Sequence, residues 1–172
     1  MQRRLLWPLL LVLALAGCTP AARSAPRSSA TAAPCPPLPT LRVVVGSIGV
    51  SPAIGSREWV TACPANGTFT GYAADSIPAV LLAKDHAAPT VIPTGATGRL
   101  LFDLAPIAGT TQLLRWDDQG QRYLPNPLPL APDDRFAFPT LSGVYGYGVR
   151  AQWKPLPGVA GDVEYGFRVE VR

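Results

Sequence analysis

The clearest pattern in the chain is an alternation of apolar and polar residues over its last third. Every second residue is apolar or aromatic in the segment 144–153, and the same period of two returns in the segment 164–172. A period of two places alternate side chains on opposite faces of a β-strand, whereas an amphipathic helix needs a period of 3.6. The two segments flank a Pro/Gly-containing turn, so the pattern predicts two long strands joined as a hairpin.

Shorter apolar segments bounded by turn residues precede this hairpin. We expect strands at 41–45, 58–63, 68–72, 79–83, 98–104, 111–116 and 121–124. The segment 76–85 has an alternative as a helical turn, because Pro78 is tolerated at the start of a helix. About eight to ten short strands in one domain are typical of a sandwich or small barrel, so the sequence predicts an all-β fold, an antiparallel β-sandwich.

Composition and charge narrow the class of protein. The chain of 172 residues has 20 prolines and 16 glycines, which argues against a helical bundle. Its net charge is +4, but four of the 15 basic residues and none of the acidic ones precede Leu38, so residues 38–172 hold 11 of each sign. A domain that binds nucleic acid carries a basic surface, so we expect no nucleic-acid partner.

The first 18 residues have the organisation of an export signal. Arg3 and Arg4 precede the apolar run 5–16, which is too short to span ~30 Å of hydrocarbon as a helix. The following Leu15-Ala16-Gly17-Cys18 resembles the lipobox of bacterial lipoproteins. The resemblance implies cleavage before Cys18, lipidation of its sulfur by diacylglyceryl, and a protein anchored by lipid on the extracytoplasmic side of the membrane. An ordinary secretory signal is the alternative.

The segment after Cys18 is rich in proline and has no aromatic residue. Residues 19–40 contain six prolines among Ala, Ser, Thr and Arg. Such a composition cannot bury enough apolar surface to order itself. We therefore expect a signal peptide at 1–17, a disordered Pro-rich tether at 18–40 and a β-sandwich domain at 41–172.

Three cysteines in an exported protein cannot all pair in disulfides within one chain. Lipidation of Cys18 would leave two. Cys35 and Cys63 then remain as an even pair, in a compartment where disulfides persist. A disulfide between them would stabilise the protein by about 3–4 kcal/mol through loop closure. A free thiol pair or a metal site is the alternative, but there is no Cys-x-x-Cys motif. We expect no metal and no other cofactor.

The residues that enter the predicted C-terminal hairpin resemble a known family. Leu141-Ser142-Gly143-Val144-Tyr145-Gly146-Tyr147 is similar to the run into the penultimate strand of immunoglobulin-like domains. The resemblance implies that Tyr145 is a tyrosine corner. It also implies that Tyr147 takes the place of the cysteine of that strand, so the usual bridge between the sheets would be absent. The alternative is a plain amphipathic strand.

The wider layout also resembles an uncharacterised group of secreted or lipid-anchored bacterial proteins. Its marks are Trp59, Ala74-Asp75-Ser76-Ile77-Pro78, Pro93-Thr94-Gly95, Trp116 and the closing Tyr-x-Tyr-x-Val-x-Ala-x-Trp pattern. The resemblance implies a single immunoglobulin-like domain and an extracytoplasmic location, and it implies no mechanism.

Candidate catalytic residues are few. His86 is the one histidine of the chain, and no His-Glu-x-x-His or Gly-x-Ser-x-Gly motif is present. We therefore expect His86 to be a surface residue and the protein not to be an enzyme. The alternative is a cell-envelope hydrolase that combines His86 with aspartates from turns, either 117–118 or 133–134.

Recognition by surface contacts is the remaining class of function. Trp59 and Trp116, with the Pro-rich loop 125–132, could form an apolar binding patch, since aromatic residues dominate interface energetics. Burial in the core is the alternative for each tryptophan. The sequence thus favours a lipid-anchored binding or structural accessory module of the bacterial cell envelope, with an envelope protein or a wall polymer as its partner.

Overall fold

The computed structural model describes residues 37–63, 68–74, 77–119, 121–156 and 159–172. The predicted signal peptide and nearly all of the predicted tether lie outside these ranges. The elements are β1 (Leu41–Val45), β2 (Ile48–Val50), β3 (Ala53–Cys63), β4 (Thr68–Ala74), α1 (Ala79–His86), β5 (Thr90–Ile92), β6 (Thr97–Phe102), β7 (Gln112–Asp117), β8 (Arg122–Tyr123), β9 (Arg135–Ala137), β10 (Gly143–Leu156) and β11 (Val159–Val171).

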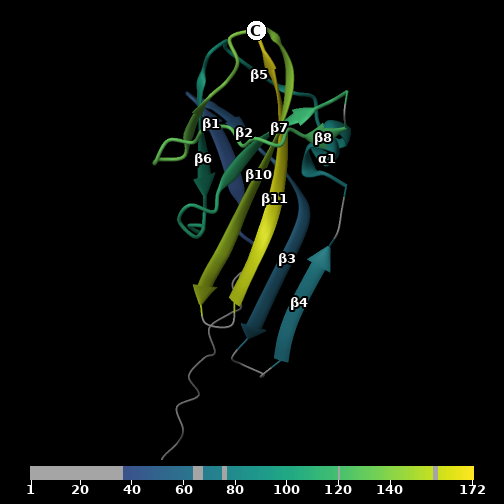
Figure 1. Ribbon diagram of the computed structural model, residues 1–172, viewed down its shortest axis with the longest axis vertical. Helices are drawn as coiled ribbons and strands as arrows, with labels where there is room; N and C mark the ends of the chain where they lie inside the picture. Colours follow the sequence, from purple (N-terminus) through teal and green to yellow (C-terminus); the bar gives the residue numbers. More distant parts are fainter. Residues whose placement is uncertain (1–36, 64–67, 75–76, 120, 157–158) are drawn as a thin grey trace, which may run out of the picture. The chain divides into compact units, whose positions relative to one another are not determined.

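The strands form two sheets in a sandwich-like arrangement, which confirms the predicted all-β sandwich (Figure 1). The small sheet has the order β2-β1-β6-β9, and the large sheet has the order β4-β3-β11-β10-β7-β8. Strand β5 joins the large sheet beside β11 and is parallel to it, whereas the other described strand pairs are antiparallel. Figure 1 shows β11, in yellow, running between β10 and β3.

The core lies between the two sheets and explains the period of two in the sequence. The odd-numbered residues of β10 and β11 face it, and Tyr147 and Phe167 stack there with ring centroids 5.1 Å apart. Phe136 and Phe138 of the small-sheet side complete this aromatic cluster around Tyr147. Buried aromatic rings contribute the largest apolar areas of any side chains, so this cluster is a main source of stability.

The predicted hairpin is confirmed, and one predicted strand is wrong. Strands β10 and β11 pair along nearly their whole length, with an irregularity between Trp153 and Leu156. The segment predicted as a strand at 79–83 belongs to the helix α1. This agrees with the alternative prediction of a helical turn that begins at Pro78. Strands β2, β5 and β9 have three residues each and were not predicted.

The outer face of the large sheet is covered by α1 and β8, and glycines make this possible. A Cβ on Gly148 would lie 2.5 Å from the ring of Tyr123 in β8, and a Cβ on Gly55 would lie 2.6 Å from the Cβ of Ala79 in α1. A Cβ on Gly166 would overlap the backbone of α1. The glycines of the large sheet therefore give the covering elements room to reach the strands.

The segment before β1 is fixed to the sandwich by hydrogen bonds of Pro39 and Thr40. The backbone N–H and the hydroxyl of Thr40 each donate to the Asp103 carboxylate at 2.8 Å. The buried hydroxyl of Tyr165 donates to the carbonyl of Pro39 at 2.7 Å, and Leu38 packs against the core. Residues 38–40, the last of the predicted tether, are therefore packed on the sandwich.

Tyr145 makes the contact that its resemblance to a tyrosine corner implies. Its hydroxyl donates to the carbonyl of Leu141, four residues upstream, at 2.9 Å. Tyr147, two residues further on, points into the core. Within the described ranges, no helix has the length and hydrophobicity needed to cross a bilayer.

Candidate functional site

The candidate site is a break along one edge of β11. Strand β3 pairs with this edge up to Gly166, and β5 pairs with it from Val169 onward. Between them, neither β3 nor β5 has a residue in register with Phe167 or Arg168, although β10 pairs with both on the other edge. The large sheet therefore has a two-residue gap in its interior, next to its most central strand.

Proline explains why the gap stays open. Pro52 comes directly before β3 and Pro89 directly before β5. Proline fixes φ near about −65°, whereas extended strands need about −120 to −140°, so proline favours the end of a strand. Both strands that could have filled the gap therefore stop at its borders.

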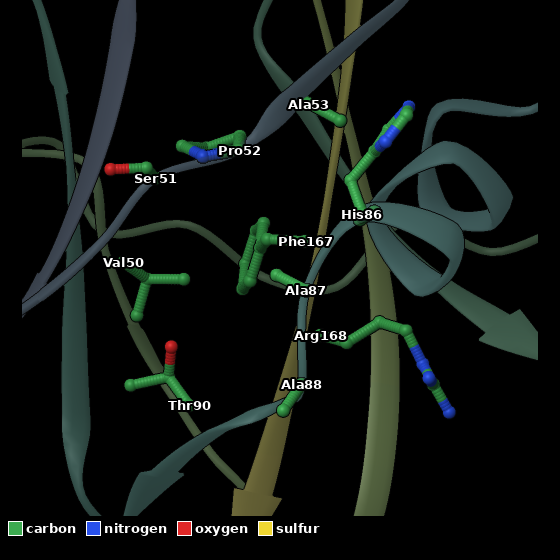
Figure 2. Close-up of a pocket in the computed structure, with 11 residues that line it drawn as sticks. Val50, Ser51, Pro52, Ala53, His86, Ala87, Ala88, Thr90, Phe167 and Arg168 are labelled. Atoms are coloured by element: carbon green, nitrogen blue, oxygen red, sulfur yellow. The ribbon is translucent and has the colours of Figure 1, made fainter.

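A cavity of about 280 Å³ lies at this gap (Figure 2). Phe167 stands in the middle of the view, among small apolar residues that include Val50 and Ala87. The polar residues that line the cavity are Ser51, His86, Thr90 and Arg168, and no carboxylate lines it. The cavity thus combines an apolar back wall with a polar rim that has no negative charge.

The backbone of β11 adds a donor to this rim. Arg172 donates its N–H to the carbonyl of Ile92 in β5 at 3.0 Å. Because strand residues two apart direct their N–H groups to the same edge, the N–H of Arg168 faces the gap. The carbonyl of Ser51 would continue the pairing of β3 with β11, and that of Ala88 would continue the pairing of β5 with β11. Neither accepts a hydrogen bond from the N–H of Arg168.

The two cationic or titratable side chains of the rim come from different elements. His86 is the last residue of α1 and is exposed, and Arg168 alternates with Phe167 and so projects from the opposite face of β11. Figure 2 shows both polar heads directed away from Phe167, with the His86 ring and the Arg168 guanidinium diverging from each other in this view. Among the described residues, neither side chain forms an ion pair.

The chain matches no protein-family model, no curated protein and no solved structure.

The described residues do not bring His86 together with the aspartates of the hydrolase alternative. Asp117 and Asp118 line a different cavity, in the turn between β7 and β8, and Asp133 and Asp134 line others before β9. The first pair accepts local hydrogen bonds at 3.1 Å, from the Gln119 backbone and from the Trp116 indole. Within the described part of the chain, no three potential metal ligands are grouped.

The two tryptophans predicted as binding residues are buried. Trp59 is 1% exposed and Trp116 is 5% exposed, so neither indole presents a recognition surface. Trp59 packs edge-to-face with Trp153 at a centroid distance of 6.4 Å, and Trp116 packs against Tyr123 at 5.0 Å. Both tryptophans are therefore buried, as the alternative predicted. Trp59 lies between the sheets and Trp116 lies beneath β8.

The predicted cysteine sites cannot be placed. Cys18, the predicted lipidation site, and Cys35 lie outside the described residues. Cys63 ends β3, but its side chain is also outside the description. Lipidation of Cys18 and a disulfide between Cys35 and Cys63 therefore stay predictions.

A buried polar cluster that the sequence did not reveal lies under α1. Glu164 of β11 is 6% exposed, and its carboxylate accepts from the N–H of Ala79 at 3.0 Å, the hydroxyl of Tyr123 at 2.8 Å and the guanidinium of Arg150 at 3.0 Å. Burial, and then the negative charge of Glu164, raise the pKa of Tyr123 far above its usual range. The carboxylate thus caps the N-terminus of α1 and ties α1, β8, β10 and β11 together.

The period of two places Glu164 on the polar face of the last strand, but this face is not open to solvent at Glu164. That face is covered where α1 and β8 pack on it. The glycines at 146, 148 and 166, which leave room for these elements, were the available signal. Every polar group of the cluster is engaged within the fold, so the cluster positions α1, whose C-terminal residue His86 borders the gap.

Proposed function

We propose that the protein is a lipid-anchored, extracytoplasmic binding module of the bacterial cell envelope. The binding role rests mainly on the gap in the large sheet, where a backbone donor, an unpaired arginine and an apolar wall border one cavity. The location is supported by Leu15-Ala16-Gly17-Cys18 and by the Pro-rich segment that follows. A lipid of two acyl chains supplies stable attachment to a membrane.

The domain itself is proposed to be immunoglobulin-like. The support is the hydrogen bond from Tyr145 to the carbonyl of Leu141, together with the inward position of Tyr147 at the place of the missing cysteine. In this proposal the contacts of Tyr147 with Phe136 and Phe138 on the small-sheet side pack the site that the inter-sheet disulfide occupies in antibody domains.

The anchor is tested by Cys18→Ala in the full-length protein expressed in a bacterium. We expect this variant to leave the membrane fraction, because the sulfur that carries the lipid is gone. Cys35→Ala is the matched control, since it removes a thiol without touching the lipobox, and it should stay in the membrane fraction. Membrane retention of Cys18→Ala equal to that of the control would contradict the proposal.

The predicted pairing of Cys35 with Cys63 is tested on the same protein. Intact mass before and after reduction, with alkylation of free thiols, distinguishes a disulfide from two thiols. We expect both cysteines to become alkylated only after reduction. Alkylation of both without reduction would contradict the predicted disulfide.

A further inference from the structure

The polar groups that border the gap in β11 are mostly donors. The N–H of Arg168 faces the gap, the guanidinium of the same residue carries a permanent positive charge, and the hydroxyls of Ser51 and Thr90 line the cavity. No carboxylate lines it. A donor-rich rim without negative charge is complementary to an anion, and an arginine fork matches the two oxygens of a carboxylate.

The rest of the cavity is apolar and small. Phe167, which is 1% exposed, forms its back wall, and most other lining residues are alanine, valine or proline. The volume of about 280 Å³ is at or below the low end of the roughly 300–1,000 Å³ that is usual for small-molecule sites. The cavity has room for a carboxylate beside a small aliphatic group, and not for a large ring system.

The geometry points to a carboxylate-binding site at the gap between β3 and β5, with Arg168 as its main anchor. The ligand is a carboxylate attached to a small apolar group, either a free short-chain acid or the last residue of a peptide. Capture of a terminal carboxylate by backbone donors is an established mode of peptide recognition. This inference rests on the binding role proposed above, and it does not depend on the lipid anchor.

The C-terminal end of α1 opposes the binding of an anion at this site. The strength of this repulsion can be compared with the attraction by Arg168. The C-terminus of α1 ends at His86, and its free carbonyls carry partial negative charge, which weakens anion binding about two- to fivefold. A charge-assisted hydrogen bond strengthens binding roughly ten- to a hundredfold. Arg168 therefore outweighs the helix end, and binding is expected to depend on this arginine.

The chemistry of the ligand is tested with three probes on the full-length protein in detergent. N-acetyl-alanyl-alanine has the free carboxylate, its C-terminal amide lacks the charge, and butyrate has the carboxylate without a peptide. We expect the acid to bind with at least tenfold higher affinity than the amide, by calorimetry or by NMR titration. Equal affinity of acid and amide, or no binding of any probe, overturns the inference.

The butyrate titration identifies the source of the carboxylate. Butyrate that binds as tightly as the peptide acid supports a free short-chain acid. Peptide acid that binds more tightly supports a peptide terminus, because its amide carbonyl can then accept from the backbone N–H at the gap.

Variants locate the site. Arg168→Gln keeps the length of the side chain and removes its charge, and we expect at least a tenfold loss of affinity for N-acetyl-alanyl-alanine. The matched control is Arg122→Gln, the same change at an exposed arginine that does not line the cavity, which should leave the affinity unchanged. An equal loss in both variants would mean that net charge alone attracts the probe, and this overturns the inference.

A second variant keeps the test decisive if Arg168→Gln is poorly folded. Ala88→Leu fills the cavity from a residue outside strands and helices and leaves Arg168 in place. It should abolish binding of the acid while the thermal unfolding transition is retained. Unchanged binding in a folded Ala88→Leu protein overturns the location. None of these results changes the membrane fractionation of Cys18→Ala, so the two proposals fail separately.

Discussion

Glu164 and Tyr147 are both buried in the large sheet, one on its outer face and the other on its inner face. The Glu164 carboxylate is saturated by a backbone N–H, a phenol and a guanidinium. The Tyr147 hydroxyl is buried among the rings of Phe136, Phe138 and Phe167 and has no hydrogen-bond partner. The two residues therefore show what happens to a buried polar group with partners and to one without.

The difference follows from what covers each face. The outer face is closed by α1 and β8, which bring their own donors, so a charged acceptor in the strand is required there. The inner face is closed by an apolar sheet, which offers no acceptor to a phenol. A polar group with partners is costly to remove, whereas an unpartnered one costs stability while it is present. Glu164 should accordingly be indispensable, and the hydroxyl of Tyr147 should be dispensable.

The largest effect is expected from Glu164→Ala. The substitution leaves the N–H of Ala79 and the hydroxyl of Tyr123 buried without an acceptor, and we expect the free energy of unfolding to fall by about 3 kcal/mol. Urea unfolding followed by tryptophan fluorescence measures it. Glu170→Ala is the matched control on the same strand, because Glu170 pairs with Arg172 at the surface, and it should cost less than about 0.5 kcal/mol. Equal losses would refute the central role of Glu164.

Gly166→Ala perturbs the packing of α1 over the Glu164 cluster. Its new Cβ would overlap the backbone of Ala79 and Val80, so α1 must lift from the sheet, and we expect a loss of about 2 kcal/mol. Gly49→Ala in β2 is the control, because its Cβ would meet only the Arg42 guanidinium, at 3.7 Å. Urea midpoints that shift equally for the two variants would show that α1 does not depend on this close contact.

Tyr123→Phe removes one donor from Glu164 and leaves the others. Its ring still packs on Trp116, so the expected loss is about 1 kcal/mol, the net value of one hydrogen bond. The same unfolding assay measures it. A double-mutant cycle with Glu164→Ala should show coupling, because the two side chains share one bond. Additive losses would mean that the bond contributes nothing.

Tyr147→Phe should have the smallest effect and the opposite sign. It removes a buried hydroxyl that has no partner, so the free energy of unfolding should stay the same or rise by up to about 1 kcal/mol. A clear loss of stability, comparable to that of Tyr123→Phe, would show that the hydroxyl has a partner after all and would break the comparison.

The stability of the protein at alkaline pH gives a second test of the Tyr147 hydroxyl. Burial raises the pKa of Tyr147 to about 12 from its ordinary value of 10.0, so the folded protein holds the proton that the unfolded chain releases. Stability linked to this group is complete below pH 10 and is lost as the pH rises from 10 to about 12. Denaturant midpoints measured across this range should fall less steeply in Tyr147→Phe than in the wild-type protein. Parallel curves would contradict the raised pKa.

The parts of the fold that sequence could predict are those in which one strand face is buried. The period of two in β10 and β11 survives in the structure because a single apolar layer contacts one face of both strands. The segment of α1 was ambiguous for a physical reason: Ala-Val-Leu-Leu is short and apolar, which suits a buried strand or one turn of helix. Its helical form depends on a cap supplied by Glu164, 85 residues away.

The candidate site was beyond local patterns for the same reason. The gap along β11 arises because β3 and β5, which are distant in sequence, both end on the same edge of this strand. The sequence of β11 alone therefore does not predict the gap. Trp59 and Trp116 were candidates for binding because composition cannot tell which face a neighbouring element will cover. His86 was rightly expected to be exposed, but its place beside the gap follows from the end of α1.

The position of β11 has a consequence for the order in which the protein can form during synthesis. Strands β3, β5 and β10 pair with β11, and β11 separates β3 from β10 in the sheet. The large sheet therefore cannot close until residues near Val171 have emerged, and earlier segments wait with unpaired edges. Removal of β11 should therefore prevent folding altogether.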